Sequence, residues 1–264
     1  MLPPGPILLY YGVLLSAVCT LLVAWQLFPD SPVVAAANRD EALGRPSEPP
    51  ARFHKEPTAI APRDGTAGGT WIGYNDAGLF VGVTNRWVDR EGSRSRGQLV
   101  ADCLELSSAT AAVDHVRAST NEATYAGFNL VVADADCAVL LEWDGELAVT
   151  EFDPGVHVVV NVGADGAFFE PEARPEVGRQ QAANATALRA ALEPADGETA
   201  SDWLDRAGEA LGDHEYGVCV HGDGFGTRSA SLIQLEDSEE MVGRYWFADG
   251  PPCRTEFERV DPER

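Results

Sequence analysis

Two apolar segments separated by a short turn constrain the fold of this chain more than any other feature. Residues 19–28 and 33–41 are rich in side chains that favour strands, and residues 29–32, Pro-Asp-Ser-Pro, form a turn sequence between them. Two antiparallel strands joined by so short a turn place the start of the first strand beside the end of the second. The cysteine that opens the first segment should therefore lie close to the charged residues that close the second.

That cysteine is Cys19, and the charged residues nearest to it are Arg39 and Asp40. A guanidinium beside a thiol favours the thiolate, which is the nucleophilic form of cysteine. A reactive Cys19 is one interpretation of this pattern. The other is a small buried side chain beside a solvated strand end, since most cysteines pack rather than react.

The charge balance of the chain excludes one class of partner. Its 264 residues give room for one large domain or two small ones, and its net charge of −23 would repel nucleic-acid phosphates. Acidic residues are spread along the whole chain, and Lys55 is the only lysine. This composition is typical of a halophilic protein, because a cytoplasm rich in salt screens the self-repulsion. The alternative is a surface that binds cationic ligands.

The spacing of cysteines and histidines predicts no metal site. The five cysteines are Cys19, Cys103, Cys137, Cys219 and Cys253. They include no Cys-x-x-Cys pair and their number is odd, so neither a disulfide framework nor a zinc cluster is expected. The histidines are scattered in the same way.

The remaining pattern predicts strands in antiparallel runs with two helical blocks between them. Residues 46–62 are rich in proline and are expected to form a loop, and residues 71–74 and 79–85 are expected to form a hairpin with Gly78 at a positive φ. The other expected elements are helices at 97–106, 110–118, 176–192 and 200–211, an antiparallel meander at 128–133, 138–143, 147–152 and 156–161, and strands at 217–221, 230–235 and 244–247. Such an order implies sheets covered by helices.

Short motifs occur along almost the whole chain from Cys19 onward. They are residues 37–41 (ANRDE), 45–46 (RP), 68–73 (GGTWIG), 84–85 (TN), 96–100 (RGQLV), 127–130 (GFNL), 154–157 (PGVH) and 226–228 (GTR). In these motifs and in their order the chain resembles the NRDE family, also called the transport and Golgi organisation protein 2 family. That family is similar to the N-terminal nucleophile hydrolases of the choloylglycine hydrolase and acyltransferase type. The resemblance implies an α+β fold, a four-layer αββα sandwich of two antiparallel sheets, formed by residues 19–264 as a single domain.

The resemblance also implies a nucleophile and its base. In this class the first residue of the mature chain supplies both, because its α-amine titrates at about pH 8, within reach of its own thiol. Cys19 would take both roles here. Arg39 would favour its thiolate, and Asp40 would hold its ammonium.

Three further residues match catalytic positions of the relatives. Asn85 and Asn161 each close a strand, and Asn85 is the candidate donor to the oxyanion; the alternative for each is a turn asparagine that satisfies local backbone. Arg228 matches a late arginine that braces the nucleophile, and a surface salt bridge is its alternative. Asn129 and His157 match the family pattern too, and core hydrogen bonding is their expected role.

Two functions follow from the resemblance. The first is an amidohydrolase or acyltransferase that acts on a small linear amide through Cys19 and requires no cofactor. The second is a non-catalytic protein that carries haem or another cofactor, since the family is associated with haem trafficking and a thiolate can ligate haem iron.

Residues 1–18 precede the region of resemblance. Together with the first strand they give an uncharged apolar run over residues 7–28, whose length would suit a membrane-spanning or signal segment. No basic residue precedes the run, its second half coincides with the expected core strand, and Val18 is not the small residue that a lipoprotein signal places before its cysteine. We therefore expect translation to begin at Val18, which would leave Cys19 first after removal of the initiating methionine, and we expect a cytoplasmic protein. A membrane segment is the alternative.

The acidic composition predicts that the protein needs salt to stay folded. At low ionic strength the spread negative charges are unscreened and repel one another. Dialysis from molar salt into dilute buffer should therefore abolish most of the far-ultraviolet circular dichroism signal. An unchanged spectrum would contradict the interpretation as a halophilic protein.

Overall fold

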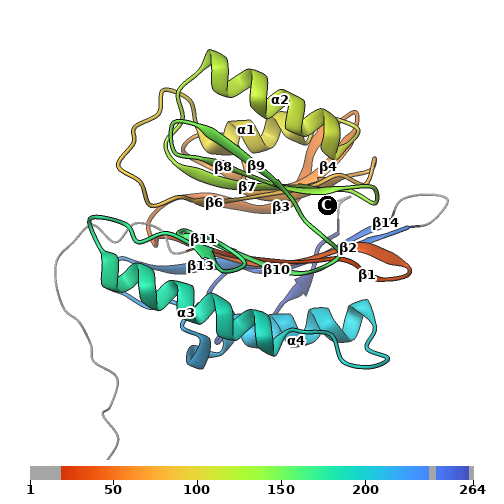
Figure 1. Ribbon diagram of the computed structural model, residues 1–264. Helices are drawn as coiled ribbons and strands as arrows, with labels where there is room; N and C mark the ends of the chain where they lie inside the picture. Colours follow the sequence, from red (N-terminus) through yellow and green to blue (C-terminus); the bar gives the residue numbers. More distant parts are fainter. Residues whose placement is uncertain (1–18, 238–241, 262–264) are drawn as a thin grey trace, which may run out of the picture.

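The computed structural model describes residues 19–237 and 242–261, so the expectations about residues 1–18 lie outside it. The described chain forms two antiparallel β-sheets stacked face to face between two layers of helices (Figure 1). The expected four-layer αββα sandwich is therefore confirmed.

The first sheet contains the hairpin that opens the described chain. Its strands lie in the order β12-β11-β10-β1-β2-β13-β14-β15. Their bounds are Ala167–Phe168 (β12), Gly163–Ala164 (β11), Gly155–Val160 (β10), Thr20–Phe28 (β1), Ser31–Ala42 (β2), Phe225–Glu236 (β13), Val242–Ala248 (β14) and Glu258–Arg259 (β15). The predicted hairpin is confirmed as β1 and β2, and it occupies the centre of this sheet.

The second sheet runs in sequence order from β3 to β9. Its strands are Ser47–Lys55 (β3), Thr58–Asp64 (β4), Ile72–Asn75 (β5), Phe80–Asn85 (β6), Phe128–Ala133 (β7), Ala138–Trp143 (β8) and Leu147–Glu151 (β9). The predicted hairpin of β5 and β6 is confirmed, with Gly78 at a φ of 82° in its turn.

The helices form the outer layers. Helices α1 (Arg96–Cys103) and α2 (Ala109–Glu122) cover the second sheet, and α3 (Pro175–Ala191) and α4 (Ala200–Gly212) cover the first (Figure 1). Local signals set several of their ends, because Ser108 caps α2, Pro175 is the first residue of α3, and Thr199 forms a capping box with Asp202 in α4. All four predicted helices are confirmed.

Alternation along the central hairpin builds two cores at once. Leu21, Val23 and Trp25 of β1 point into the space between the sheets, whereas Leu22 and Ala24 point toward α3 and α4. This period of two is the pattern of a strand buried on both faces. It explains why the hairpin is apolar almost without interruption.

The predicted loop at 46–62 is wrong, because this segment forms β3 and β4. Proline removes a donor from the ladder and is tolerated at the edge of a sheet or at a bulge. Both conditions hold here: β3 is the edge strand of the second sheet, and its register with β4 is irregular between Glu48 and Ala51, where Pro49 and Pro50 lie.

Two other expectations fail for reasons of topology. The meander is correct for β7, β8 and β9, but β10 leaves that sheet and pairs with β1 in the first one. Residues 217–221 form no strand; they follow the short 3₁₀ helix η1 (His214–Tyr216) as a loop, in which His221 makes an isolated bridge to Gly226.

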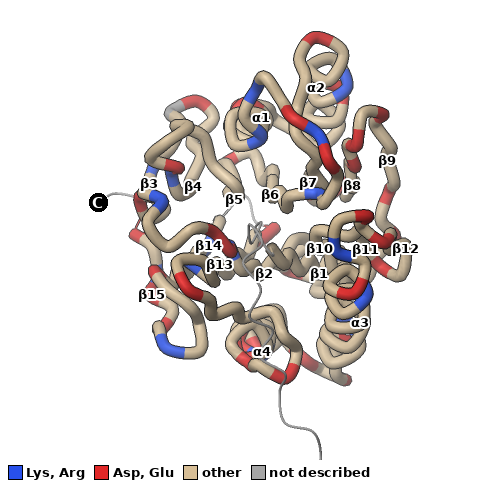
Figure 2. Tube along the Cα trace, turned by 90° about the vertical axis from the view of Figure 1, so that its left-hand side faces the viewer, with Lys and Arg blue, Asp and Glu red and all other residues tan. Residues whose placement is uncertain are grey.

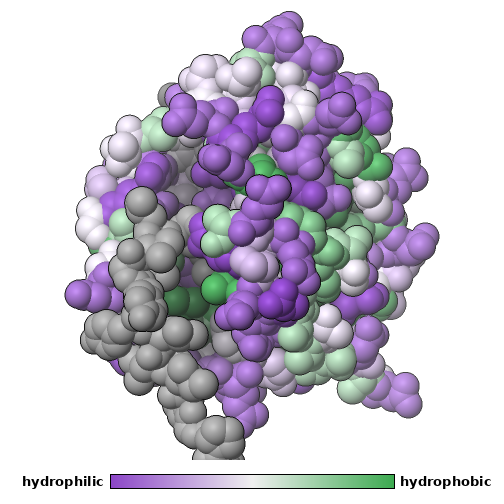
Figure 3. Space-filling model, turned by 60° about the vertical axis from the view of Figure 1, so that its left-hand side comes forward, coloured by the Kyte–Doolittle hydropathy of each residue, from purple (hydrophilic) through white to green (hydrophobic). Residues whose placement is uncertain are grey.

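The surface agrees with the charge of the sequence. Figure 2 shows acidic residues distributed over helices, loops and strand ends rather than gathered in one patch. On the face drawn in Figure 3, hydrophilic side chains cover most of the described surface. No helix in the described part of the chain is long and apolar enough to cross a membrane.

A close backbone contact between the β4–β5 connection and the start of α1 predicts that Gly69 cannot be replaced by a larger residue without loss of stability. A Cβ on Gly69 would lie 2.2 Å from the carbonyl carbon of Gly97, whose oxygen accepts a hydrogen bond from Thr70 N. Gly69→Ala should lower the free energy of unfolding by about 1–3 kcal/mol, the usual effect of overpacking, measured by urea unfolding. Gly44→Ala is the control, since nothing lies within 4 Å of its Cβ position. Equal stability of the two variants would contradict the prediction.

Candidate active site

Cys19 lies immediately before β1, beside the strands that flank β1 on either side. Thr20 pairs with Asn38 of β2 and with Val160 of β10. Cys19 precedes Thr20 by one residue. In this antiparallel register it therefore lies opposite the Arg39–Asp40 end of β2 and opposite Asn161, which follows β10. The thiol Sγ lies 3.9 Å from the backbone oxygen of Asp40, as the hairpin argument predicts.

A cavity of about 140 Å³ opens between the two sheets at this point. The first sheet contributes the start of β1 and the end of β2, and the second contributes β5, β6 and the loop before α1. Among its lining residues are Cys19, Arg39, Asp40, Glu41, Arg45, Asp64, Trp71, Asn85 and Arg96. The fold thus brings four of the six candidate residues to one cavity, and Asn161 contacts Cys19 beneath it.

Asn161 is fully buried, and hydrogen bonds fix its side-chain orientation. Its Oδ1 accepts from the backbone nitrogen of Cys19 at 3.0 Å and from Nε2 of Gln181, on α3, at 2.9 Å. Its Nδ2 donates to the backbone oxygen of Asn85 at 2.7 Å. One amide therefore joins the end of β6 to the nitrogen of Cys19, which is more than a turn asparagine does.

Asp40 is a buried carboxyl with one oxygen in use. Its Oδ1 accepts from the hydroxyl of Thr227, on β13, at 2.6 Å, and its Oδ2 has no hydrogen-bond partner within the described chain. Burial raises the pKa of Asp40 well above its usual range, although the Thr227 hydrogen bond acts in the opposite direction. A cation placed beside Oδ2 would restore the charged form.

Arg39 is buried and held by acidic and aromatic neighbours. Its Nη2 lies 3.3 Å from Asp64 Oδ2 and 3.8 Å from Glu41, and its guanidinium stacks over the ring of Trp71 at 4.1 Å. Burial lowers the pKa of Arg39, which these acidic neighbours raise in turn. Its Nη1 has no partner within the described chain, so the cavity contains one unused charged donor.

Arg39 favours the thiolate of Cys19, as expected, but in the chain as described other effects outweigh it. Burial, and then the negative charge of Asp40, raise the pKa of the Cys19 thiol to about 12, and the opposing effect of Arg39 is smaller. Glu41, which lies 3.8 Å from Nη2 of Arg39, also raises the pKa of the thiol. A neutral thiol needs a base before it can attack.

Arg228 does not lie in this cavity. It is the extra residue of a bulge in β13, where the register with β2 shifts between Thr227 and Ser229. Its Nη1 donates to the exposed Asp249 at 2.9 Å, so the alternative of a surface salt bridge describes it better than a brace for the nucleophile.

The two residues expected to serve the core do so. Asn129 Nδ2 donates to Val160 O at 2.8 Å, linking the two sheets. His157 bonds Asp165 at 2.6 Å and Asp153 O at 2.8 Å, and it stacks on Phe152.

Two residues of the cavity escaped the sequence argument. Asp64 closes β4 and accepts from Arg45 at 2.7 and 3.1 Å, which fixes the carboxylate that in turn holds Arg39. Arg96 opens α1, and burial lowers its pKa while the nearby Cys19 raises it. The family motif that begins at Arg96 could have pointed to this residue. Asp64 had no such signal, because it lies just beyond the segment that was wrongly expected to be a loop.

The stacked antiparallel sheets between helical layers, with a cysteine opening a central strand, define an N-terminal nucleophile hydrolase-like fold. The chain belongs to the Transport and Golgi organisation 2 family, whose sequence pattern matches residues 18–243. The human Transport and Golgi organization protein 2 homolog is 29% identical over 88% of both chains. The mouse homolog is 33% identical, but the match spans only 38% of its length and 39% of this chain.

Two solved structures resemble the fold at low sequence identity. A single-residue variant of conjugated bile acid hydrolase from Clostridium perfringens aligns with 93% of each chain at a TM-score of 0.54 and 13% identity. The Caenorhabditis elegans N-acylethanolamine-hydrolyzing acid amidase ortholog covers 81% of this chain and 92% of its own, at a TM-score of 0.55 and 14% identity. Both confirm the N-terminal nucleophile hydrolase-like fold.

The raised pKa of Asp40 predicts a stabilising substitution. The folded chain holds this proton more tightly than the unfolded chain, so stability is lost as the pH rises above the ordinary aspartate pKa of about 3.9. Asp40→Asn keeps an acceptor for Thr227 and cannot ionise. In urea unfolding at fixed high salt, in the chain that retains the residues before Cys19, it should be more stable than the wild type at pH 8, with the difference shrinking toward pH 4.

Asp76→Asn is the matched control, since Asp76 is exposed in the β5–β6 turn and should show no such pH dependence. An Asp40→Asn variant that is less stable than the wild type at every pH would contradict the account of Asp40 as a desolvated carboxyl.

Proposed function

We propose that the protein is an N-terminal-cysteine amidohydrolase or acyltransferase that acts on a small linear amide. The observation that carries this proposal is the hydrogen bond from the nitrogen of Cys19 to Oδ1 of the buried Asn161, at 3.0 Å. It holds that nitrogen at the cavity, next to its own thiol. In a chain that begins at Cys19, the same nitrogen is a free amine.

The free amine supplies the base that the thiol lacks. It titrates at about pH 8, so it can accept the thiol proton at neutral pH. The thiolate then attacks the amide carbon, and the tetrahedral intermediate expels the amine of the substrate with the proton returned by the Cys19 ammonium. Water, or an acceptor amine in the transferase case, attacks the resulting thioester and releases the acyl group from Sγ.

Asp40 fits the role of partner to the ammonium. Asp40 lines the same cavity and its Oδ2 has no partner within the described chain, so a positive charge on the Cys19 nitrogen would lower its raised pKa. Removal of the residues before Cys19 would therefore let the Cys19 amine and the Asp40 carboxyl become charged together. This coupling would leave the longer chain inactive.

Asn85 is the residue we assign to the oxyanion. It closes β6 on the second sheet and lines the cavity opposite Cys19, and its backbone is tied to Asn161. That tie fixes Asn85 relative to the Cys19 nitrogen, as a donor used in the transition state requires. The unused Nη1 of Arg39 would bind a polar or anionic group of the substrate.

We also propose that the protein works in a cytoplasm of high salt. Support comes from the net charge of −23 and from the single lysine among 19 basic residues.

Substitutions at Cys19 and Asn85 test the proposal on the chain that begins at Cys19. Against a panel of short N-acyl amides, Cys19→Ala should abolish turnover and Cys19→Ser should retain a trace, because a hydroxyl is the weaker nucleophile. Asn85→Ala should lower kcat by roughly a hundredfold with little change in KM, which marks a donor used mainly in the transition state. Asn121→Ala, on the exposed side of α2, is the control and should leave kcat unchanged. Turnover that survives in Cys19→Ala would refute the assignment.

A cofactor carrier is the second candidate, and one observation favours it. A cleft of about 1090 Å³ adjoins the Cys19 cavity and is lined by Arg86, Arg90, Arg96 and Arg174, against three carboxylates. So many arginines in one cleft of an acidic chain suit an anionic ligand such as haem. The cavity at Cys19 does not suit haem, since its 140 Å³ is below the roughly 300–1000 Å³ of ordinary ligand pockets.

Haem titration separates the two functions. A carrier of this kind should give a Soret band of equal intensity in the wild type and in Cys19→Ala, together with no turnover on the amide panel. Absence of haem binding would eliminate this candidate.

A further inference from the structure

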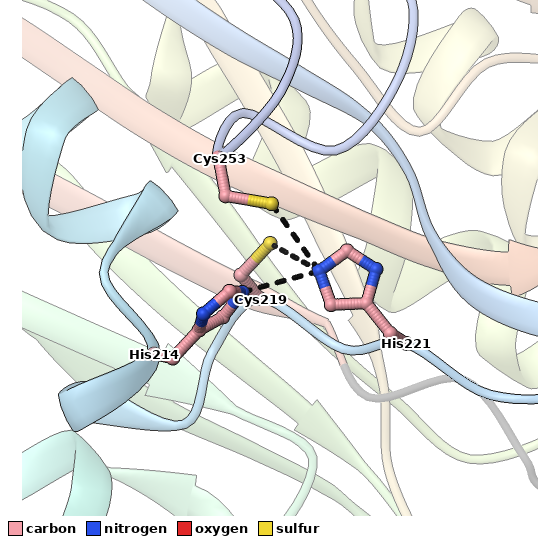
Figure 4. A group of neighbouring side chains, drawn as sticks. All are labelled: His214, Cys219, His221 and Cys253. Atoms are coloured by element: carbon pink, nitrogen blue, oxygen red, sulfur yellow. Dashed lines mark hydrogen bonds between the residues drawn. The ribbon is translucent and has the colours of Figure 1, made fainter.

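Four side chains of types that bind metals converge beside the first sheet, and none of them lines the Cys19 cavity. They are His214 on η1, Cys219 and His221 in the loop that follows, and Cys253 in the segment after β14 (Figure 4). Their ligand atoms all lie within 4.8 Å of one another. The spacing of the sequence did not indicate this group, because Cys253 lies 32 residues beyond His221 and only the fold brings the two together.

The distances match those around a tetrahedral ion. Nε2 of His221 lies 3.2 Å from Nε2 of His214, 3.6 Å from Sγ of Cys219 and 3.2 Å from Sγ of Cys253. Tetrahedral zinc, with Zn–N of about 2.0–2.1 Å and Zn–S of about 2.3 Å, separates two nitrogens by about 3.4 Å and a nitrogen from a sulfur by about 3.6 Å. The four side chains therefore need little movement to enclose one ion.

We propose that His214, Cys219, His221 and Cys253 bind one Zn²⁺. Two thiolates and two imidazoles are the donor set that zinc prefers, whereas Ca²⁺ and Mg²⁺ require oxygen ligands. Each thiol gives up its proton on binding, so the two thiolates neutralise the charge of the ion. Four protein ligands leave no open position, which makes the site structural rather than catalytic.

The loop that carries two of these ligands also supports the Cys19 cavity. The backbone oxygen of Val218 accepts from Asn38 Nδ2 at 2.9 Å, and Val220 N donates to the hydroxyl of Thr227 at 2.8 Å. That same hydroxyl donates to Asp40. A zinc ion would thus fix the loop, and the segment around Cys253, against the end of β2 where Asp40 lies.

Metal content of the full-length protein, purified with a reductant, tests the proposal. After reconstitution with Zn²⁺ and removal of the excess, the wild type should retain about one equivalent of zinc. Replacement by Co²⁺ should give the visible absorption of a tetrahedral site together with thiolate-to-cobalt charge transfer. Cys253→Ser should bind zinc at least tenfold more weakly. Cys137→Ser is the matched control, since Cys137 lies in the turn between β7 and β8, beside Thr110, and it should keep both the zinc and the cobalt spectrum.

Thermal unfolding provides a second readout that does not depend on activity. A chelator should lower the Tm of the wild type and of Cys137→Ser but leave that of Cys253→Ser unchanged, because only the first two hold metal. Two results would overturn the proposal. One is a folded wild type that retains less than a tenth of an equivalent of zinc after reconstitution. The other is a Cys219–Cys253 disulfide in the reductant-purified protein, seen in the intact mass as a loss of two hydrogens.

Discussion

The pairing of β1 with β2 on one side and β10 on the other is the constraint on which the rest of the structure depends. Its register sets Cys19 against the end of β2 and against Asn161 at the same time. A shift of one residue would turn Leu21 and Leu22 to the wrong cores and would separate the nitrogen of Cys19 from Asn161. The fold and the candidate active site thus rest on the same backbone hydrogen bonds.

The cavity is lined by buried polar groups whose desolvation lowers the stability of the folded state. Asp40, Arg39 and Asn161 are almost completely buried, and among the described residues Asp40 and Arg39 each retain an atom without a partner. Unpaired polar atoms in a low-dielectric interior are costly, and they persist where function requires them. Under the proposed function, this carboxylate oxygen would pair with the Cys19 amine, and the guanidinium nitrogen would bind a polar or anionic group of the substrate. The surrounding apolar sheets supply the stability that this arrangement needs.

Local patterns in the sequence correctly predicted the helices and strands whose formation depends on neighbouring residues. The β1–β2 hairpin, the Gly78 turn and the four helices followed from alternation, turn residues and apolar spacing. The failures involve long-range pairing: nothing local shows that β10 joins β1 rather than β9, or that Pro49 and Pro50 lie on an edge strand. Within the candidate site, Asp40 was found through the hairpin and a family motif, and Asn161 through its place at a strand end. The burial that keeps the Cys19 thiol neutral arises only in the folded chain. The His214–Cys253 group was invisible for the same reason.

The central claim is that Cys19 becomes a nucleophile when its own nitrogen is a free amine. The most direct measurement is the pH profile of iodoacetamide labelling at Cys19, followed by peptide mass spectrometry in two chains: one that begins at Cys19 and one that retains the preceding residues. In the longer chain the thiol pKa of about 12 should make labelling at pH 7 slow. In the chain that begins at Cys19 the rate at pH 7 should rise at least tenfold, with a midpoint near the amine pKa of about 8, while Cys137 labels equally in both. Equal, slow labelling of Cys19 in the two chains would contradict the account.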